Sequence, residues 1–317
     1  MEAFLAPRGL IIDLITPLSR DGDIDGDGLG RHLDRVLPHV QAIFLASPYV
    51  GEGTNLTSTQ RDELLEKSLV VVQGRVPILI WISQDTEEKT SETLLLLKKR
   101  LELHTYTGPI FWVDTPLFYH SNRGLPAHYE HISSMVEDPF ILHNDPALIQ
   151  SLDRPLKREN LRTSILKELA QINNMKGLIF LGSLDRSHNY QKAVRSRIDF
   201  RIYDGDESHF LRHPSLSGVV SHGANLAPRA WQRVTASSLN LSGNQKEYPD
   251  YLQQIWEMGD YVGSLKDIYH GNDVPLIKQV LSDMGIIEDP ICTYKERDVG
   301  EGKKMLKELM ERHGDYH

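Results

Sequence analysis

The sequence predicts an α/β protein built on a (β/α)8 barrel, and three observations lead to this prediction. Short apolar runs alternate with longer amphipathic segments over roughly the first 225 residues. Eight such runs occur, which is the number of parallel strands that this barrel needs. No Gly-rich dinucleotide-binding fingerprint follows the first run, so the open-sheet alternative lacks its best support.

The eight expected strands are nearly continuous in apolar residues, as in parallel strands that are covered on both faces. In chain order they are GLIIDLIT (9–16), AIFLAS (42–47), VPILIWIS (76–83), PIFWVDT (109–115), PFILHN (139–144), GLIFLG (177–182), FRIYDG (200–205) and SGVVSHG (217–223).

Helical patterns separate these strands, and beyond the last strand only helical patterns are found. The segment 58–74 opens with Ser58 as its N-cap and closes at Gly74. In the segment 86–104, three leucines fall on one helical face, and the segment 158–172 has a similar pattern. After about residue 225 the strand signals stop, and four helices are expected at 228–239, 249–270, 273–285 and 300–314. We therefore expect a barrel over 1–224 and a C-terminal helical subdomain over 225–317.

Length, charge and cysteine content narrow the function classes. The chain has 317 residues, 40% of them hydrophobic, which is enough for a substantial core. Its net charge of -9 argues against a nucleic-acid partner, because phosphate contacts need clustered Lys and Arg. Cys292 is the only cysteine, which excludes an intrachain disulfide and a Cys-based metal cluster. Without a signal-peptide pattern or an apolar stretch of membrane-spanning length, we expect a cytoplasmic protein with no membrane partner.

Catalytic groups of such a barrel lie at the C-terminal ends of the strands. Polar residues gather there, but no lysine does: Asp114, His143, Asp145, Asp204, Asp206, Glu207 and His222. Histidine beside carboxylates can bind a divalent metal or transfer protons near neutral pH. No pair here has the spacing of a known metal motif, and neither a phosphate-binding loop nor a nucleophile elbow occurs. We therefore expect no metal and no cofactor.

Seven segments, in chain order, resemble the dihydrodipicolinate synthase/N-acetylneuraminate lyase family. They are LITPLSRDGDIDGDGLGRHLD (14–34), LASPYVGEGTNLTSTQRDEL (45–64), DTPLFYHSNRGLPAHYEHI (114–132), ILHNDP (141–146), DGDE (204–207), GVVSHGANLAP (218–228) and GNDVPLIKQVLSDMG (271–285). The resemblance covers nearly the whole chain. It implies a class I aldolase-like lyase, in which a lysine forms a Schiff base with pyruvate or a related 2-keto acid. It also implies a homodimer or homotetramer, with Phe118 and Tyr119 at a subunit contact.

The residues that carry this chemistry in the family differ here. The resemblance places Ile179 where the family has its lysine, and His143 where it has the tyrosine that relays protons. Ser47 and Pro48 stand in place of the paired threonines, and Leu148 in place of the arginine that recruits the second substrate. Because isoleucine has no nucleophilic atom, we expect no Schiff-base aldolase activity.

We expect a small carboxylate, keto acid or sugar acid to bind at the barrel mouth. The strand ends and the resemblance together imply these pocket residues: Ser47, Glu52, Phe118, Tyr119, His143, Ile179, Gly205 and Val220. The ligand's carboxylate should depend on Ser47 and on the backbone N–H groups of the loop 47–53. Two alternatives stay open. One is a lyase or hydratase that uses His143 with nearby carboxylates, with or without a metal, and the other is a non-catalytic structural oligomer.

Overall fold

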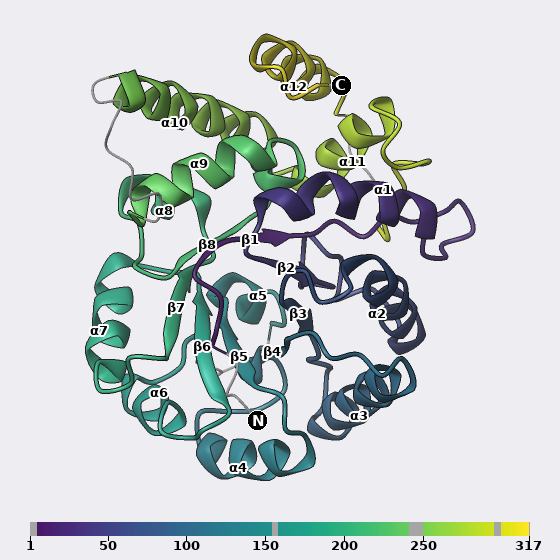
Figure 1. Cartoon of the computed structure of the whole chain (residues 1–317). Helices are drawn as coiled ribbons and strands as arrows, with labels where there is room; N and C mark the ends of the chain where they lie inside the picture. Colours follow the sequence, from purple (N-terminus) through teal and green to yellow (C-terminus); the bar gives the residue numbers. More distant parts are fainter. Residues whose placement is uncertain (1–4, 154–157, 241–249, 295–298, 317) are drawn as a thin grey trace.

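The computed structural model describes residues 5–153, 158–240, 250–294 and 299–316. Within these ranges, parallel strands pair in sequence order from β1 to β8 and close into a barrel that helices surround (Figure 1). The prediction of a (β/α)8 barrel is confirmed. No helix in the described ranges is both long and apolar enough to cross a membrane.

Each strand overlaps the run that predicts it. The strands are β1 Gly9–Asp13, β2 Ala42–Leu45, β3 Ile78–Trp81, β4 Ile110–Asp114, β5 Phe140–Asn144, β6 Met175–Phe180, β7 Arg201–Asp204 and β8 Gly218–Ser221. Most are shorter than predicted because the last residues of the runs leave the ladder and form the loops of the barrel mouth. The strand β6 instead begins two residues early and ends before Gly182, whose φ is 150°.

Helices follow the strands as expected. They are α1 Gly26–Val36, α2 Ser58–Val72, α3 Glu87–Leu103, α4 Leu125–Met135, α5 Pro146–Gln150, α6 Thr163–Leu169, α7 Leu184–Val194, α8 Glu207–Arg212, α9 Pro228–Ser238, α10 Asp250–Tyr269, α11 Asp273–Asp283 and α12 Gly300–His313, with 3-10 turns η1 Leu37–His39, η2 Pro116–Phe118 and η3 Gly223–Asn225. The N-cap of α2 is Thr57 rather than Ser58, because Thr57 and Gln60 form a capping box.

Side chains alternate between the two faces of the barrel wall. One set, which includes Ile11, Phe44 and Ile179, packs together inside the barrel. The residues between them, such as Ile12 and Leu178, belong to the larger core between the strands and the helices. This period of two follows from strand geometry, and it decides which strand-end residues can reach the barrel mouth.

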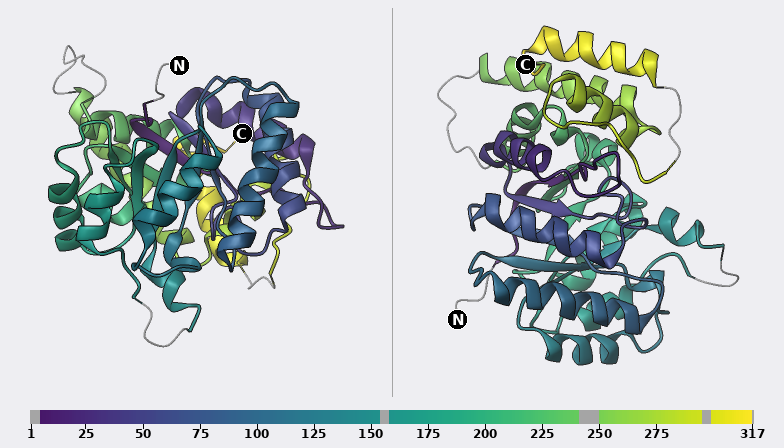
Figure 2. Two further views of the ribbon diagram at one scale, coloured as in Figure 1. Left: turned by 90° about the horizontal axis from the view of Figure 1, so that it is seen from below. Right: turned by 90° about the vertical axis from the view of Figure 1, so that its right-hand side faces the viewer.

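The C-terminal helices lie together on one side of the barrel, beside β8, β1 and α1 (Figures 1 and 2). The helix α9 packs against β1, and α10 packs against α9 and α8. A buried ion pair joins Lys278 of α11 to Glu52 in the loop after β2, and Lys278 also donates to the carbonyl of Ile291. Since Thr293 donates through its N–H and its hydroxyl to the same carboxylate, this segment is fixed over the barrel mouth.

Candidate functional site

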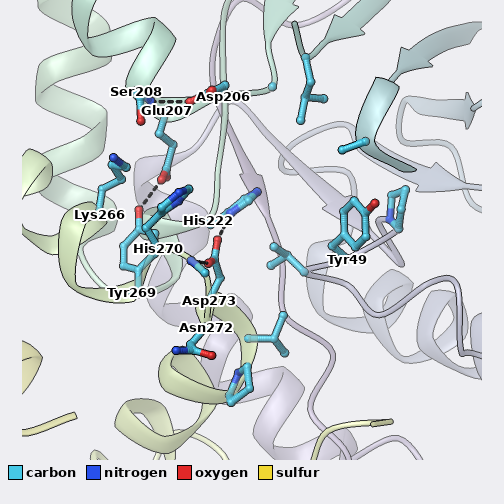
Figure 3. A pocket seen from close by; sticks show the side chains of 18 of the residues that line it. Tyr49, Asp206, Glu207, Ser208, His222, Lys266, Tyr269, His270, Asn272 and Asp273 are labelled. Carbon is cyan, nitrogen blue, oxygen red and sulfur yellow. Dashed lines mark hydrogen bonds and ion pairs between the residues drawn. The ribbon is translucent and has the colours of Figure 1, made fainter. Parts of the chain in front are cut away.

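A cavity of about 950 Å³ lies between the mouth of the barrel and the C-terminal helices. Its walls come from the loop after β2, the ends of β7 and β8, and the connection from α10 to α11. In the view of Figure 3, His222 lies between Tyr49 on one side and Lys266 with Tyr269 on the other. A cavity at this end of the barrel is where catalytic groups of such folds gather.

His222 follows β8, and its ring lies between two carboxylates. Its Nδ1 is 2.8 Å from Oδ2 of Asp273, the first residue of α11 (Figure 3). Its Nε2 is 3.5 Å from Oδ2 of Asp13, the last residue of β1. Burial by itself would lower the pKa of His222, but the hydrogen bond to Asp273 and the charges of Asp13 and Glu207 outweigh it and raise the pKa to about 9. The ring is therefore a cation at neutral pH.

Asp13 is a site residue that the sequence analysis missed. Burial raises the pKa of Asp13 to about 6, against the opposing effects of His222 and a hydrogen bond from Ser47. Among the described residues, no donor reaches its Oδ1. Asp13 lies two residues after Ile11, so it points to the inside of the barrel, and a carboxylate in an otherwise apolar first run was the signal available in the sequence.

The side chain of Asn225 joins the ends of β1 and β8. Its Nδ2 donates to the carbonyl of Asp13 (2.7 Å) and to the carbonyl of His222 (2.8 Å). Its Oδ1 accepts from the N–H of Ile15 and lies 2.9 Å from Nε2 of His32. This fully buried amide therefore fixes the spacing between Asp13 and His222.

Glu207 also lines the cavity, but both of its carboxylate oxygens already accept hydrogen bonds from other residues. Its Oε1 accepts from the hydroxyl of Ser221 and the N–H of Gly223, and its Oε2 accepts from the hydroxyl of Tyr269. The carboxylate therefore links β8, η3 and α10 and shapes the cavity wall. No group of three or more His, Cys, Asp or Glu side chains in the described part of the chain could hold a metal ion.

Most of the predicted pocket residues do not line the cavity. Ile179 and Val220 are 1% and 3% exposed and pack in the interior of the barrel. Gly205 does line the cavity, together with Leu181. A Cβ at Gly205 would lie 2.4 Å from the Leu181 side chain, so glycine allows this leucine to cover the mouth above Ile179. The cavity thus lies farther out than the predicted pocket residues, toward the C-terminal helices.

The loop 47–53 uses several of its N–H groups within the loop. The N–H of Gly51 donates to the hydroxyl of Ser47, that of Gly53 donates to the carbonyl of Ser47, and that of Glu52 donates to the carbonyl of Tyr49. Glu52 itself is the partner of Lys278. Each of these three N–H groups therefore already has an acceptor within the loop, and the role of the loop in holding a ligand's carboxylate stays a prediction.

His143 is buried in the interior and hydrogen-bonded there. The hydroxyl of Thr115 accepts from Trp81 Nε1 (2.9 Å) and is hydrogen-bonded to Nδ1 of His143 at 3.0 Å. Burial lowers the pKa of His143, which agrees with a neutral ring. The described residues that line the cavity do not include His143. It contributes to the floor of the mouth rather than to the cavity wall.

Phe118 and Tyr119 pack within their own chain. The Phe118 ring meets Trp81 edge-on, with 5.7 Å between centroids. The Tyr119 hydroxyl donates to Asp114, which also accepts from Tyr129, and it lies 2.9 Å from Nε2 of His128. The Tyr119 hydroxyl is therefore engaged in a network behind β4.

Lysine side chains lie outside the barrel interior in the described structure. Lys176 is the single lysine on a described strand, and its Nζ pairs with Asp199 (3.1 Å) at the N-terminal end of the barrel. Lys278 is covered and paired with Glu52. Lys266 of α10 lines the cavity, with its Nζ 2.9 Å from Asp267.

Comparisons with known proteins agree on one family. The sequence model of the dihydrodipicolinate synthetase family matches residues 6–297. A 4-hydroxy-tetrahydrodipicolinate synthase of Thermotoga neapolitana is 25% identical over 309 residues, which cover 95% of this chain and 98% of that protein. The same enzyme of Protochlamydia amoebophila is 26% identical over 312 residues, covering 95% and 96%.

Solved structures show the same fold. The dihydrodipicolinate synthase of Aquifex aeolicus superposes with a TM-score of 0.77 at 20% identity, over 98% of this chain and 99% of that one. The chloride-inhibited enzyme of Acinetobacter baumannii, solved in complex with pyruvate, superposes with a TM-score of 0.77 at 21% identity, over 98% and 100%.

Proposed function

Because this chain belongs to the dihydrodipicolinate synthetase family, we propose that it binds a 2-keto acid or sugar acid at the barrel mouth without forming an imine. The observation that carries the proposal is Ile179. It follows Gly177 and Leu178 on β6, pairs in register with His143 and points into the barrel, at the place where the resemblance puts the family's lysine. An alkyl side chain cannot attack a carbonyl carbon.

Other lysines near the mouth are poorly suited to replace it. Lys278 is fully buried, with its Nζ held by Glu52 and by the carbonyl of Ile291. Lys266 lies on a helix rather than on a strand, and its Nζ pairs with Asp267. An ammonium group in an ion pair must lose its proton before it can attack. We propose that Lys266 instead attracts the ligand's carboxylate.

The size of the cavity and the few polar groups on its largely apolar lining favour a hydroxylated ligand. Small-molecule pockets measure roughly 300–1,000 Å³, so a cavity of about 950 Å³ suits a hexose-derived acid better than pyruvate. Lys266 and the imidazolium of His222 provide positive charge for a carboxylate or a carbonyl oxygen. Asp206 and Asn272 also line the cavity and can accept hydrogen bonds from hydroxyl groups. Such a ligand has both kinds of group.

The test combines binding with chemical trapping. Isothermal calorimetry with ketodeoxygluconate, a hexose-derived 2-keto acid, should show binding, and pyruvate should bind more weakly. Borohydride added to the saturated protein should leave its intact mass unchanged. A stable mass increase would contradict the proposal, and peptide mapping would identify the lysine. The variant Lys266→Arg is the matched control, since it keeps the charge and removes the primary amine.

The lyase or hydratase alternative needs an ionisable group on the cavity wall. His143 lies beneath the wall and is neutral, whereas His222 lies on the wall and is charged. The geometry therefore favours His222 over His143 for any proton transfer.

We further propose a cytoplasmic homodimer or homotetramer, in line with the family resemblance. One related solved structure is described as a monomeric dihydrodipicolinate synthase variant, so the assembly needs its own measurement. Sedimentation at micromolar concentration should show a dimer or larger species. A monomer alone would count against this assembly and against the structural-oligomer alternative.

A further inference from the structure

His222 lines the cavity, and Asp13 lies directly beneath it, so the two side chains present complementary proton-transfer groups. The 3.5 Å separation between His222 Nε2 and Asp13 Oδ2 is too long for a strong hydrogen bond, so a ligand oxygen can accept the Nε2 proton. The other oxygen of Asp13 has no donor among the described residues, although its side chain is only 8% exposed. A buried carboxylate oxygen without a partner is costly in a purely structural role.

Three neighbouring side chains hold the pair in this arrangement. Asp273 binds Nδ1 of His222 and so keeps Nε2 turned toward Asp13. Asn225 joins the backbone carbonyls of both residues. Glu207, fixed by Tyr269 and by the N–H of Gly223, adds negative charge near the ring. Each comes from a different element, so the geometry depends on both the barrel and the C-terminal helices.

We propose that Asp13 and His222 form an acid–base centre that catalyses keto–enol proton transfer on a bound 2-keto acid. This inference rests on the proposed function, which supplies the 2-keto acid. It assigns to the site an activity that needs neither an imine nor a metal. Asp13 and His222 are the catalytic residues, and Asp273 and Asn225 are positioning residues.

The step balances without any further reactant. The carboxylate of Asp13 takes a proton from the carbon next to the ketone, and the electron pair of that C–H bond becomes the new C=C bond. The π electrons of the carbonyl form an O–H bond with the proton that His222 Nε2 gives up. The products are an enol, a protonated Asp13 and a neutral His222. The reverse step restores the keto acid, and in D2O the carbon then carries deuterium.

The two groups have the required protonation states at the same pH. With a pKa of about 6 for Asp13 and about 9 for His222, the carboxylate is ionised and the ring is protonated between these values. A base and an acid separated in this way are typical of enzymes that enolise carbonyl compounds. The charged groups that face the ring are Asp13 from β1, Glu207 from α8 and Asp273 from α11. Deuterium exchange should therefore rise through about pH 6 and fall through about pH 9.

Proton NMR in D2O tests the inference, with ketodeoxygluconate and pyruvate as probes. The wild-type protein should exchange the protons next to the ketone faster than buffer does. His222→Gln and Asp13→Asn should each lower the rate about 100-fold or more. Asp273→Asn should move the alkaline limb of the pH profile to lower pH, a change that a merely structural role would not produce. Circular dichroism confirms that each variant is folded.

Matched controls lie on the outer helix α7. His188→Gln and Asp185→Asn make the same changes at exposed positions, and both should exchange like the wild type. If ketodeoxygluconate binds in calorimetry but is not exchanged, the acid–base centre is refuted and the binding proposal stands. Exchange within threefold of wild type in both His222→Gln and Asp13→Asn also refutes it. If neither keto acid binds, both proposals fail.

Discussion

Replacement of Lys278 by methionine should cost the protein a large part of its stability. Both side chains of the Lys278–Glu52 pair are fully buried. Removal of one partner from a buried pair leaves an uncompensated charge and costs about 3–5 kcal/mol. Since Thr293 still donates twice to Glu52, we place the loss at the lower end, near 3 kcal/mol.

Urea denaturation followed by circular dichroism measures this loss. The matched control is Lys303→Met on α12, whose partner Asp283 is partly exposed, and an exposed pair contributes about 0–1 kcal/mol. The double variant Glu52→Gln/Lys278→Met removes both charges and should recover part of the stability. A loss below about 1 kcal/mol for Lys278→Met, equal to that of the control, would refute the reasoning that this pair fixes α11 over the mouth.

Three further predictions concern the site. The pKa of His222 in the folded protein, about 9, lies above its ordinary value of 6.5, so protonation favours folding. The free energy of unfolding lost in His222→Gln should therefore be largest below about pH 6.5, at a few kcal/mol, and should vanish as the pH rises through about 9. Urea titrations at several pH values measure this dependence. Asn225→Ala breaks the link between β1 and β8 and leaves buried groups unpaired, so it should cost roughly 3 kcal/mol and also slow deuterium exchange; full stability would contradict this role. Ile179→Lys should not restore aldolase turnover with pyruvate, because His143 and Leu148 still stand where the resemblance has the proton relay and the recruiting arginine; substantial turnover in a coupled assay would show that the remaining site is intact.

The fold was predictable from the sequence because its strands are covered on both faces. Each strand appears as an apolar run, and the helices between strands have ordinary periodicity and caps, so the order of elements followed directly. The four C-terminal helices were equally visible. Errors fell at element ends, such as the cap at Thr57, where a capping box decides the boundary.

The site was harder to predict because it depends on contacts between segments that are far apart in the sequence. The sequence pattern places Ile179 in the barrel interior, but it does not show that Gly205, after β7, leaves room for Leu181 above it. Three N–H groups of the loop 47–53 have acceptors within the loop, and these bonds depend on a loop conformation that the sequence does not show. Asp13 was hidden in an apolar run. His222 was noted as a polar strand end, but only the packing of α11 brings Asp273 to it.

The most direct test of the central claim asks whether the ketone carbon of the bound ligand becomes an imine carbon. Carbon NMR of ketodeoxygluconate, isotope-labelled at the ketone carbon and bound to the wild-type protein at neutral pH, follows that atom alone. We predict a ketone or enol signal that broadens on binding and returns unchanged when the ligand is displaced. An imine signal, lost in a single lysine variant, would contradict the proposal.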